Sequence, residues 1–218
     1  MHRTLPTLVL SAVVICIIVG SAQDCFGQNQ SVNVSVFSDV RIPEQVLALA
    51  EQTASQIFSS AGVDVVWINC IAGPSTTPDQ GCSKSYGPRD LVLRITFHVS
   101  RATSDATFGV AWLADDGSGR YADVFWTRAQ ELCTNSNADL GQILGSVMAH
   151  EMGHLLLGVN SHSVTGLMQA RWRGGELHRV AMGTLLFSPE QGNRMRAHLS
   201  AAAVALVSAR NGQPGIRP

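Results

Sequence analysis

The chain has 218 residues, which is enough for one domain with a core of its own. Apolar residues make up 45% of it and charged residues 14%, a composition that excludes an intrinsically disordered protein. The formal net charge is −1, so the chain lacks the large basic field that would bind nucleic acid or an anionic membrane.

Residues 1–22 have the pattern of a secretory signal peptide. Arg3 supplies a positive start, Leu8–Gly20 is an apolar run (LVLSAVVICIIVG), and small residues follow it up to Ala22. Because this run is too short to span a bilayer comfortably, we expect cleavage between about residues 22 and 28, and an uncleaved anchor is the alternative. The mature protein is then secreted or periplasmic and has no membrane attachment.

Alternating or β-rich segments of the mature chain predict five strands. A helix, opened by Pro43 and ended by Gly62, separates the first two strands. The third segment alternates cleanly, which predicts a strand with one buried face. The residues expected on that buried face are Leu91, Leu93, Ile95, Phe97 and Val99. The five predicted strands are Val32–Phe37, Val63–Asn69, Leu91–Val99, Thr107–Leu113 and Tyr121–Trp126.

Cys16 leaves with the signal peptide, and export allows the remaining cysteines to form disulfides. Cys70 and Cys82 flank a loop rich in Gly, Pro, Ser and Thr, which predicts a local disulfide between them. Cys25, if the mature chain keeps it, and Cys133 are left over. Either these two pair with each other or Cys133 is a buried thiol, and their spacing does not decide between the two.

Two helices are expected after the strands. Ser136 and Asp139 form a capping-box pattern at the start of the first helix, and Gly158 is a natural stop at its end. The last helix starts at Ser188 and reaches Ser208, with the segment between the two helices interpreted as loops.

The first of these helices carries an H-E-x-x-H motif, from His150 to His154. Residues four apart lie on one helix face, so the two imidazoles can bind one zinc ion. Glu151 lies beside the metal without binding it and can act as general base towards the water that zinc activates. Ordinary surface histidines are the alternative, but the surrounding sequence (MAHEMGHLLLG) is largely apolar, so a polar cluster here needs partners.

The sequence after the motif resembles the metzincin family of zinc peptidases, whose pattern is H-E-x-x-H-x-x-G-x-x-H followed by a Met-turn. The run SHSVTGLM is similar to the matrixin form of that segment and to small exported bacterial proteins. The resemblance implies His162 as the third zinc ligand and Met168 as the Met-turn. The spacing departs from the family pattern, because Asn160 stands where metzincins have the third histidine. A gluzincin arrangement, in which Glu176 is the third ligand, is therefore the alternative.

The resemblance also implies an α+β fold with a twisted mixed sheet, one antiparallel edge strand, an active-site helix and a C-terminal helix. In metzincins the edge strand binds extended substrate by main-chain pairing. Thr107–Leu113 has the matching place, so Gly109, Val110 and Ala111 are expected to contact substrate. Residues 29–218 would then form one zincin-like catalytic domain.

We therefore predict a secreted metalloendopeptidase that uses Zn²⁺ to hydrolyse peptide bonds and acts as a monomer on peptide or protein substrates. One alternative is a secreted binding module in which zinc serves only the structure. Another is a gluzincin-type zinc hydrolase, or one that acts on an amide outside proteins. The lone histidines His98 and His178, and Trp172, are interpreted as structural rather than functional residues.

Overall fold

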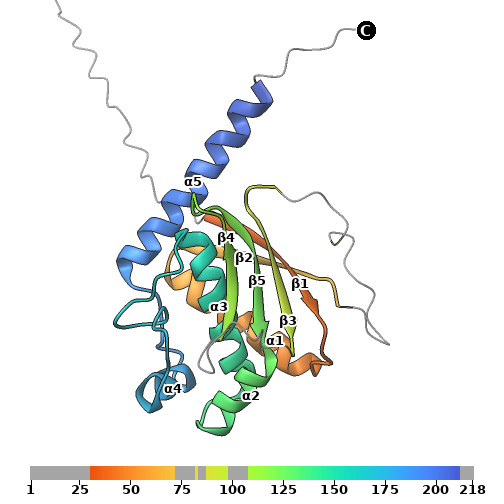
Figure 1. The fold of residues 1–218 in the computed structure, drawn as a ribbon, viewed down its shortest axis with the longest axis vertical. Coiled ribbons are helices and arrows are strands. Elements are labelled where there is room, and N and C mark those ends of the chain that lie inside the picture. Colours follow the sequence, from red (N-terminus) through yellow and green to blue (C-terminus); the bar gives the residue numbers. More distant parts are fainter. Residues whose placement is uncertain (1–29, 72–81, 83–86, 98–107, 212–218) are drawn as a thin grey trace, which may run out of the picture.

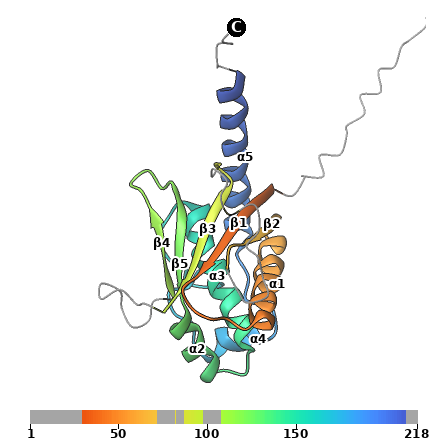
Figure 2. The ribbon, with the colours of Figure 1, turned by 90° about the vertical axis from the view of Figure 1, so that its right-hand side faces the viewer.

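The computed structural model describes residues 30–71, 82, 87–97 and 108–211. The predicted signal peptide, Cys25 and His98 lie outside the described residues. The chain forms a five-stranded sheet with helices packed mainly on one face (Figures 1 and 2). No helix in these described ranges is both long enough and apolar enough to cross a membrane.

The sheet has the strand order β2-β1-β3-β5-β4. Four strands are parallel, and β4 pairs antiparallel with β5 at one edge. This edge strand therefore has one side free of backbone pairing within the sheet, as the family resemblance implies for this segment. The strands are β1 (Gln30–Ser38), β2 (Val63–Asn69), β3 (Asp90–Thr96), β4 (Gly109–Leu113) and β5 (Gly119–Phe125).

Five helices follow or connect these strands. Figure 2 shows α1 and α3 side by side on one face of the sheet, and α5 runs past the end of the sheet. The sequence predicts α1, α3 and α5 but misses α2 and α4. The helices are α1 (Glu44–Ser60), α2 (Trp126–Thr134), α3 (Leu140–Leu157), α4 (Gly174–Ala181) and α5 (Pro189–Asn211).

Neither of the two missed helices has Ser, Thr, Asp or Asn at its N-cap position, which Phe125 and Arg173 occupy. Phe125 precedes α2 and makes no side-chain cap, and the helix continues directly from β5. The start of α4 is a Gly174-Gly175 pair, which by propensity favours a loop. The helix is nevertheless held in place by Leu177 and Val180, which are buried in the common core. Tertiary packing therefore overrides local propensity in α4.

The core lies between the sheet and helices α1 and α3. Alternate residues of β1 and β3 point into it, including Val34, Leu93 and Ile95, which are fully buried. The strand prediction fails at its end: β3 stops at Thr96, and the side chain of Phe97 is 57% exposed instead of buried. Alternation alone does not reveal where a strand leaves the sheet.

A glycine allows α3 to pack closely on α1. A Cβ atom at Gly145 would lie 2.3 Å from the carbonyl oxygen of Ala50, far inside contact distance. The start of α3 also differs from the sequence prediction. The residue that caps the helix is Asp139, not Ser136, and its capping-box partner is Gln142. At the other end Gly158 adopts a left-handed conformation (φ 67°), as expected for a helix stop.

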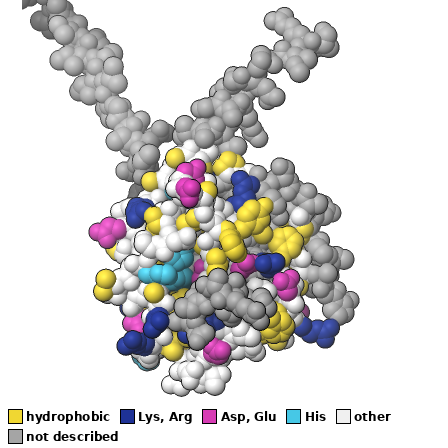
Figure 3. Space-filling model, viewed as in Figure 1, with side chains coloured by type: hydrophobic (Ala, Val, Ile, Leu, Met, Phe, Trp, Pro, Cys, Tyr) yellow, Lys and Arg dark blue, Asp and Glu magenta, His cyan; other side chains and the backbone are white. Residues whose placement is uncertain are grey.

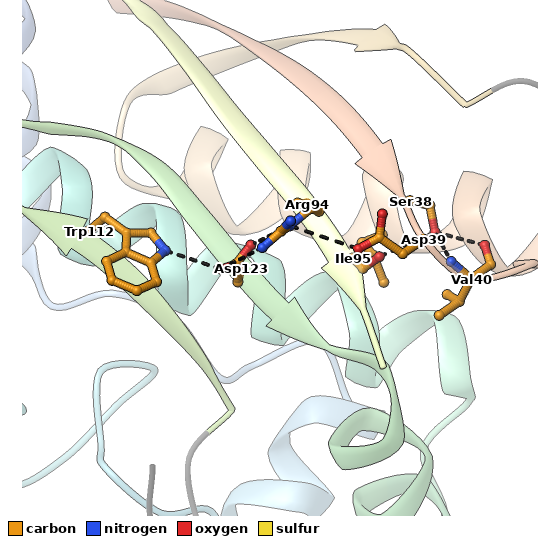
Figure 4. Close-up of polar contacts among 7 residues, drawn as sticks. All are labelled: Ser38, Asp39, Val40, Arg94, Ile95, Trp112 and Asp123. Atoms are coloured by element: carbon orange, nitrogen blue, oxygen red, sulfur yellow. Dashed lines mark hydrogen bonds and ion pairs between the residues drawn. The ribbon is translucent and has the colours of Figure 1, made fainter. Parts of the chain in front are cut away.

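The edge strand is tied to its neighbours on the outer face of the sheet. The indole nitrogen Nε1 of Trp112 in β4 donates to Asp123 in β5 at 3.1 Å, and Arg94 in β3 donates twice to the same carboxylate at 2.8 and 3.2 Å (Figure 4). Asp39 approaches the same guanidinium at 3.9 Å. Because one carboxylate joins three strands, this network fixes β4 against the rest of the sheet.

The structure contains the disulfide that the cysteine spacing predicts, between Cys70 and Cys82. Cys133 in α2 is a half-buried free thiol, and burial raises its pKa. Its Sγ lies 3.5 Å from the carbonyl oxygen of Ala138. Cys25 lies outside the described residues, so a disulfide between Cys25 and Cys133 is not tested by the structure.

Candidate metal centre

Three imidazoles meet at one point beside the edge strand. Helix α3 supplies His150 and His154 from one face, and the loop after Gly158 brings His162 to them. One nitrogen from each ring lies within 4.8 Å of the other two. In the space-filling view, histidine side chains reach the surface of this face (Figure 3). The spacing within the helix explains why His150 and His154 lie together, and the path of the loop explains why His162 joins them.

Backbone carbonyls orient the two helical imidazoles. Nδ1 of His150 lies 2.8 Å from the carbonyl oxygen of Leu167, and Nδ1 of His154 lies 2.8 Å from that of Val159. A carbonyl only accepts, so both Nδ1 atoms carry the proton and both Nε2 atoms present lone pairs. The Nε2 atom of each therefore points its lone pair towards the common centre, as in metal sites whose ligands are held by outer hydrogen bonds.

The spacing of these lone pairs fits zinc. The two Nε2 atoms are 3.2 Å apart, and no proton is left to bridge them because both rings are protonated at Nδ1. Tetrahedral zinc with Zn–N bonds of roughly 2.0–2.1 Å places two ligand nitrogens about 3.4 Å apart. A cation between the rings would remove the repulsion of the two lone pairs, so the residues present fit a zinc ion.

Burial keeps the three imidazoles neutral. His150 is almost completely buried, which lowers its pKa to about 3. Burial likewise lowers the pKa of His154 and, although its side chain is partly exposed, that of His162. Since a metal ligand must be the neutral imidazole, the site is ready to bind a cation at neutral pH without first losing protons from these rings.

Glu151 lies beside this cluster in an apolar environment. Its residue is 3% exposed, and burial, with a smaller contribution from the charge of Asp123, raises its pKa to about 8. The side chain packs against β4, where Gly109 leaves room for it. A carboxyl group with a pKa near neutrality can both accept and donate a proton under physiological conditions.

A cleft of about 330 Å³ brings the cluster and the edge strand together. All three residues of β4 for which the family resemblance implies substrate contact line it, together with the three histidines and Glu151. Asn160, which occupies the family position of the third histidine, also lines it. The lining residues are Phe108, Gly109, Val110, Ala111, His150, Glu151, His154, Asn160, His162, Ala170 and Arg171.

Met168 packs beneath the motif. Its side chain is 1% exposed, and a Cβ at Gly153 would lie 2.8 Å from its sulfur atom. The glycine inside the H-E-x-x-H motif therefore allows the close approach of Met168 to α3. The carbonyl of Met168 accepts a hydrogen bond from the backbone nitrogen of Ser163 at 2.8 Å, which closes the loop that carries His162.

Glu176, the alternative third ligand, lies away from the histidine cluster. The carboxylate of Glu176 accepts a hydrogen bond from the backbone nitrogen of Arg173 at 3.1 Å, at the start of α4. Glu176 lines neither the cleft nor the cluster of possible metal ligands that the described residues form. The same holds for His178, which is exposed on α4. The structure thus brings His162, and not Glu176, to the motif.

Trp172 is buried, as expected of a structural residue, but the sequence does not predict its contact with the histidine cluster. Its indole nitrogen Nε1 donates to the carbonyl oxygen of Leu167 at 3.2 Å, the same oxygen that holds His150. Phe108 packs against both rings, with centroids 5.1 Å from His150 and 4.4 Å from Trp172. Trp172 lies 22 residues beyond His150 in the chain, and no local pattern signals the contact.

No family model matches the sequence, and no curated protein matches it. Among solved structures, archaemetzincin from Methanopyrus kandleri is similar at 18% identity and a TM-score of 0.48, over 80% of this chain and 98% of that one. A zinc-dependent peptidase from Methanocorpusculum labreanum is similar at 18% identity and a TM-score of 0.49, over 76% of this chain and 99% of that one.

Proposed function

We propose that this protein is an exported zinc-dependent peptidase of metzincin type. The observation that carries the proposal is the meeting of three neutral imidazoles, a buried carboxyl group and a sheet edge in one cleft. Each part alone has a structural explanation. Together they are what the hydrolysis of an extended peptide requires.

His150, His154 and His162 would hold the zinc ion, and the described residues offer no fourth side chain to this cluster. Three protein ligands with an open position are typical of catalytic rather than structural zinc. When bound, the ion would supply Lewis-acid chemistry by polarising the scissile carbonyl and lowering the pKa of water. Met168 would form the apolar floor below it.

Glu151 would move the proton. Its buried carboxylate would accept a proton from the attacking water and pass it to the leaving amine. The free side of β4 would hold the substrate by backbone pairing, with Gly109, Val110 and Ala111 along the cleft. This pairing favours an extended peptide over a small amide outside proteins, and the open metal position disfavours a purely structural zinc site.

The decisive experiment measures zinc and hydrolysis together. Mature protein is purified as wild type, His162→Ala, Glu176→Gln and Glu151→Gln, and each is assayed for bound zinc and for cleavage of a fluorogenic peptide library. We expect one zinc per chain in the wild type and in Glu176→Gln, and weakened zinc binding in His162→Ala. Glu151→Gln should keep its zinc and lose activity by orders of magnitude.

His178→Ala is the matched control for His162→Ala, because His178 is an exposed histidine away from the cleft. Absence of zinc in the wild type after reconstitution would reject the peptidase, and so would near-full activity of Glu151→Gln. Full zinc without hydrolysis of any peptide would leave the binding-module alternative.

Export is part of the proposal and rests on residues 1–22. The expected result is that the full chain, expressed in a bacterium with a secretory pathway, yields a processed protein outside the cytoplasm. N-terminal sequencing should find the cleavage point between about residues 22 and 28. An unprocessed protein that stays with the membrane fraction would instead support the uncleaved anchor.

A further inference from the structure

Arg171 lines the cleft, and none of the roles above uses it. The other described residues that line the cleft are apolar or neutral, apart from Glu151 and the three histidines. Among the described residues that line the cleft, Arg171 is the one arginine or lysine, and its charge would add to that of the proposed zinc ion.

The guanidinium of Arg171 is also free to bind a ligand. Its side chain makes no hydrogen bond or ion pair with any residue that the structure describes, and the residue is exposed. Other arginines are committed to carbonyl, carboxylate or amide oxygens of the fold. These are Arg89, Arg94, Arg128, Arg179, Arg194 and Arg196.

The backbone that carries Arg171 is anchored through the residue that follows it. Trp172, the next residue, is 4% exposed and is held by Leu167 and by the ring of Phe108. Ala170, the residue before, lines the same cleft. The side chain of Arg171 thus starts from a fixed point at the cleft wall, which reduces the entropy that a bound ligand must remove from the protein.

A free guanidinium at the wall of a binding cleft is best suited to bind a carboxylate. Its planar fork donates two parallel hydrogen bonds to a carboxylate, and such charge-assisted pairs are stronger than neutral ones. We propose that Arg171 selects peptides that carry a carboxylate close to the bond to be cleaved, either from an acidic side chain or from the peptide's own C-terminus. This selection rests on the proposed peptidase function, which supplies the reason for a peptide in the cleft.

Binding tests the selection without relying on turnover. Zinc-loaded Glu151→Gln protein is titrated with fluorescent peptides that differ by a single Gln→Glu change, scanned over the central positions with an amidated C-terminus. A second set is neutral throughout and ends in either a free or an amidated C-terminus. We expect one position, or the free terminus, to improve the affinity about tenfold or more, with a smaller gain at high salt.

Two variants in the same Glu151→Gln background identify the residue responsible. Arg171→Gln should remove the preference for the carboxylate, and Arg171→Glu should shift it to peptides with Lys at the same position. Arg173→Gln is the matched control, because Arg173 is an exposed arginine two residues away that does not line the cleft. It should leave the preference unchanged.

The same peptides are then offered to the wild-type enzyme and to Arg171→Gln. The ratio of kcat/KM between acidic and neutral peptides should fall about tenfold or more in the variant. Equal binding of the paired peptides, including no measurable binding of either, overturns the selection, as does an equal loss in Arg173→Gln. If the protein prefers carboxylate peptides in binding but hydrolyses no peptide, the peptidase function is rejected and the carboxylate site is kept. If it hydrolyses peptides without such a preference, the carboxylate site is rejected and the peptidase function is kept.

Discussion

The side chain of Glu151 occupies the space that Gly109 leaves on the helix side of β4. A Cβ at Gly109 would lie 2.8 Å from Cγ and 2.9 Å from Cδ of Glu151, and 2.1 Å from the carbonyl oxygen of Asp123. The family resemblance implies that Gly109 contacts substrate. In the structure, the absence of its side chain also determines where the carboxyl group on α3 can lie.

Gly109→Ala should therefore destabilise the protein and displace Glu151. We expect a cost of about 1–3 kcal/mol or more in the free energy of unfolding, because the new methyl group has no free volume. Combined with Glu151→Ala, which removes Cγ and Cδ, the cost of Gly109→Ala should shrink, although the contact with the Asp123 carbonyl remains. Urea unfolding of the zinc-free single and double variants measures this coupling, and additive costs within about 0.5 kcal/mol would show that the two residues do not compete for space.

Zinc binding should release a proton from Glu151. In the zinc-free protein its pKa is about 8, so at pH 7 about nine tenths of the molecules keep that proton. A divalent cation close by favours the carboxylate and lowers this pKa, so the proton leaves on binding and the zinc affinity rises with pH up to about 8.

Calorimetry in buffers of different ionisation enthalpy counts the protons released at pH 7. Wild type should release close to one proton more than Glu151→Gln, which has none to lose at this position. The three histidines contribute little, because their lowered pKa values leave them neutral already. Equal proton release by the two proteins would contradict the raised pKa of Glu151.

Trp172 should act on zinc affinity through the carbonyl of Leu167. Trp172→Phe keeps an aromatic ring against Phe108 but removes the donor that shares the Leu167 oxygen with His150. We expect the zinc dissociation constant to rise about tenfold, as for other residues that orient a metal ligand. Trp112→Phe is the control, since it removes an indole donor on the outer face of the sheet. A chelator competition that finds the two variants alike would contradict this role of Trp172.

Met168 should be necessary for the stability of the fold because its side chain fills the space below α3. Met168→Ala leaves a cavity in a fully buried position and should cost about 2–5 kcal/mol of unfolding free energy. Met168→Leu nearly conserves the volume and should cost less than about 1.5 kcal/mol and keep the zinc. If thermal or urea unfolding shows Met168→Leu to be as damaging as Met168→Ala, the sulfur atom itself, packed against Gly153, is required.

The strands, the helix α3 and the positions of two of the three histidines could be predicted from the sequence, because local periodicity carries that information. Spacing of four residues places His150 and His154 on one face wherever the helix lies, and Gly158 ends it with a left-handed turn. The errors fall where local signals are weak or misleading: the capping residue of α3, the end of β3 at Phe97, and the helix that begins at Gly174.

What only the tertiary structure decides is which distant residues meet. The choice between His162 and Glu176 depends on the path of a loop that deviates from the family spacing, and the shared carbonyl of Leu167 joins Trp172 to His150 across 22 residues. The strand order places β4 at the sheet edge beside α3, which brings Gly109 to Glu151 and sets Arg171 at the wall of the same cleft. Such contacts arise from the packing of the whole chain into one core, and no short stretch of sequence encodes them.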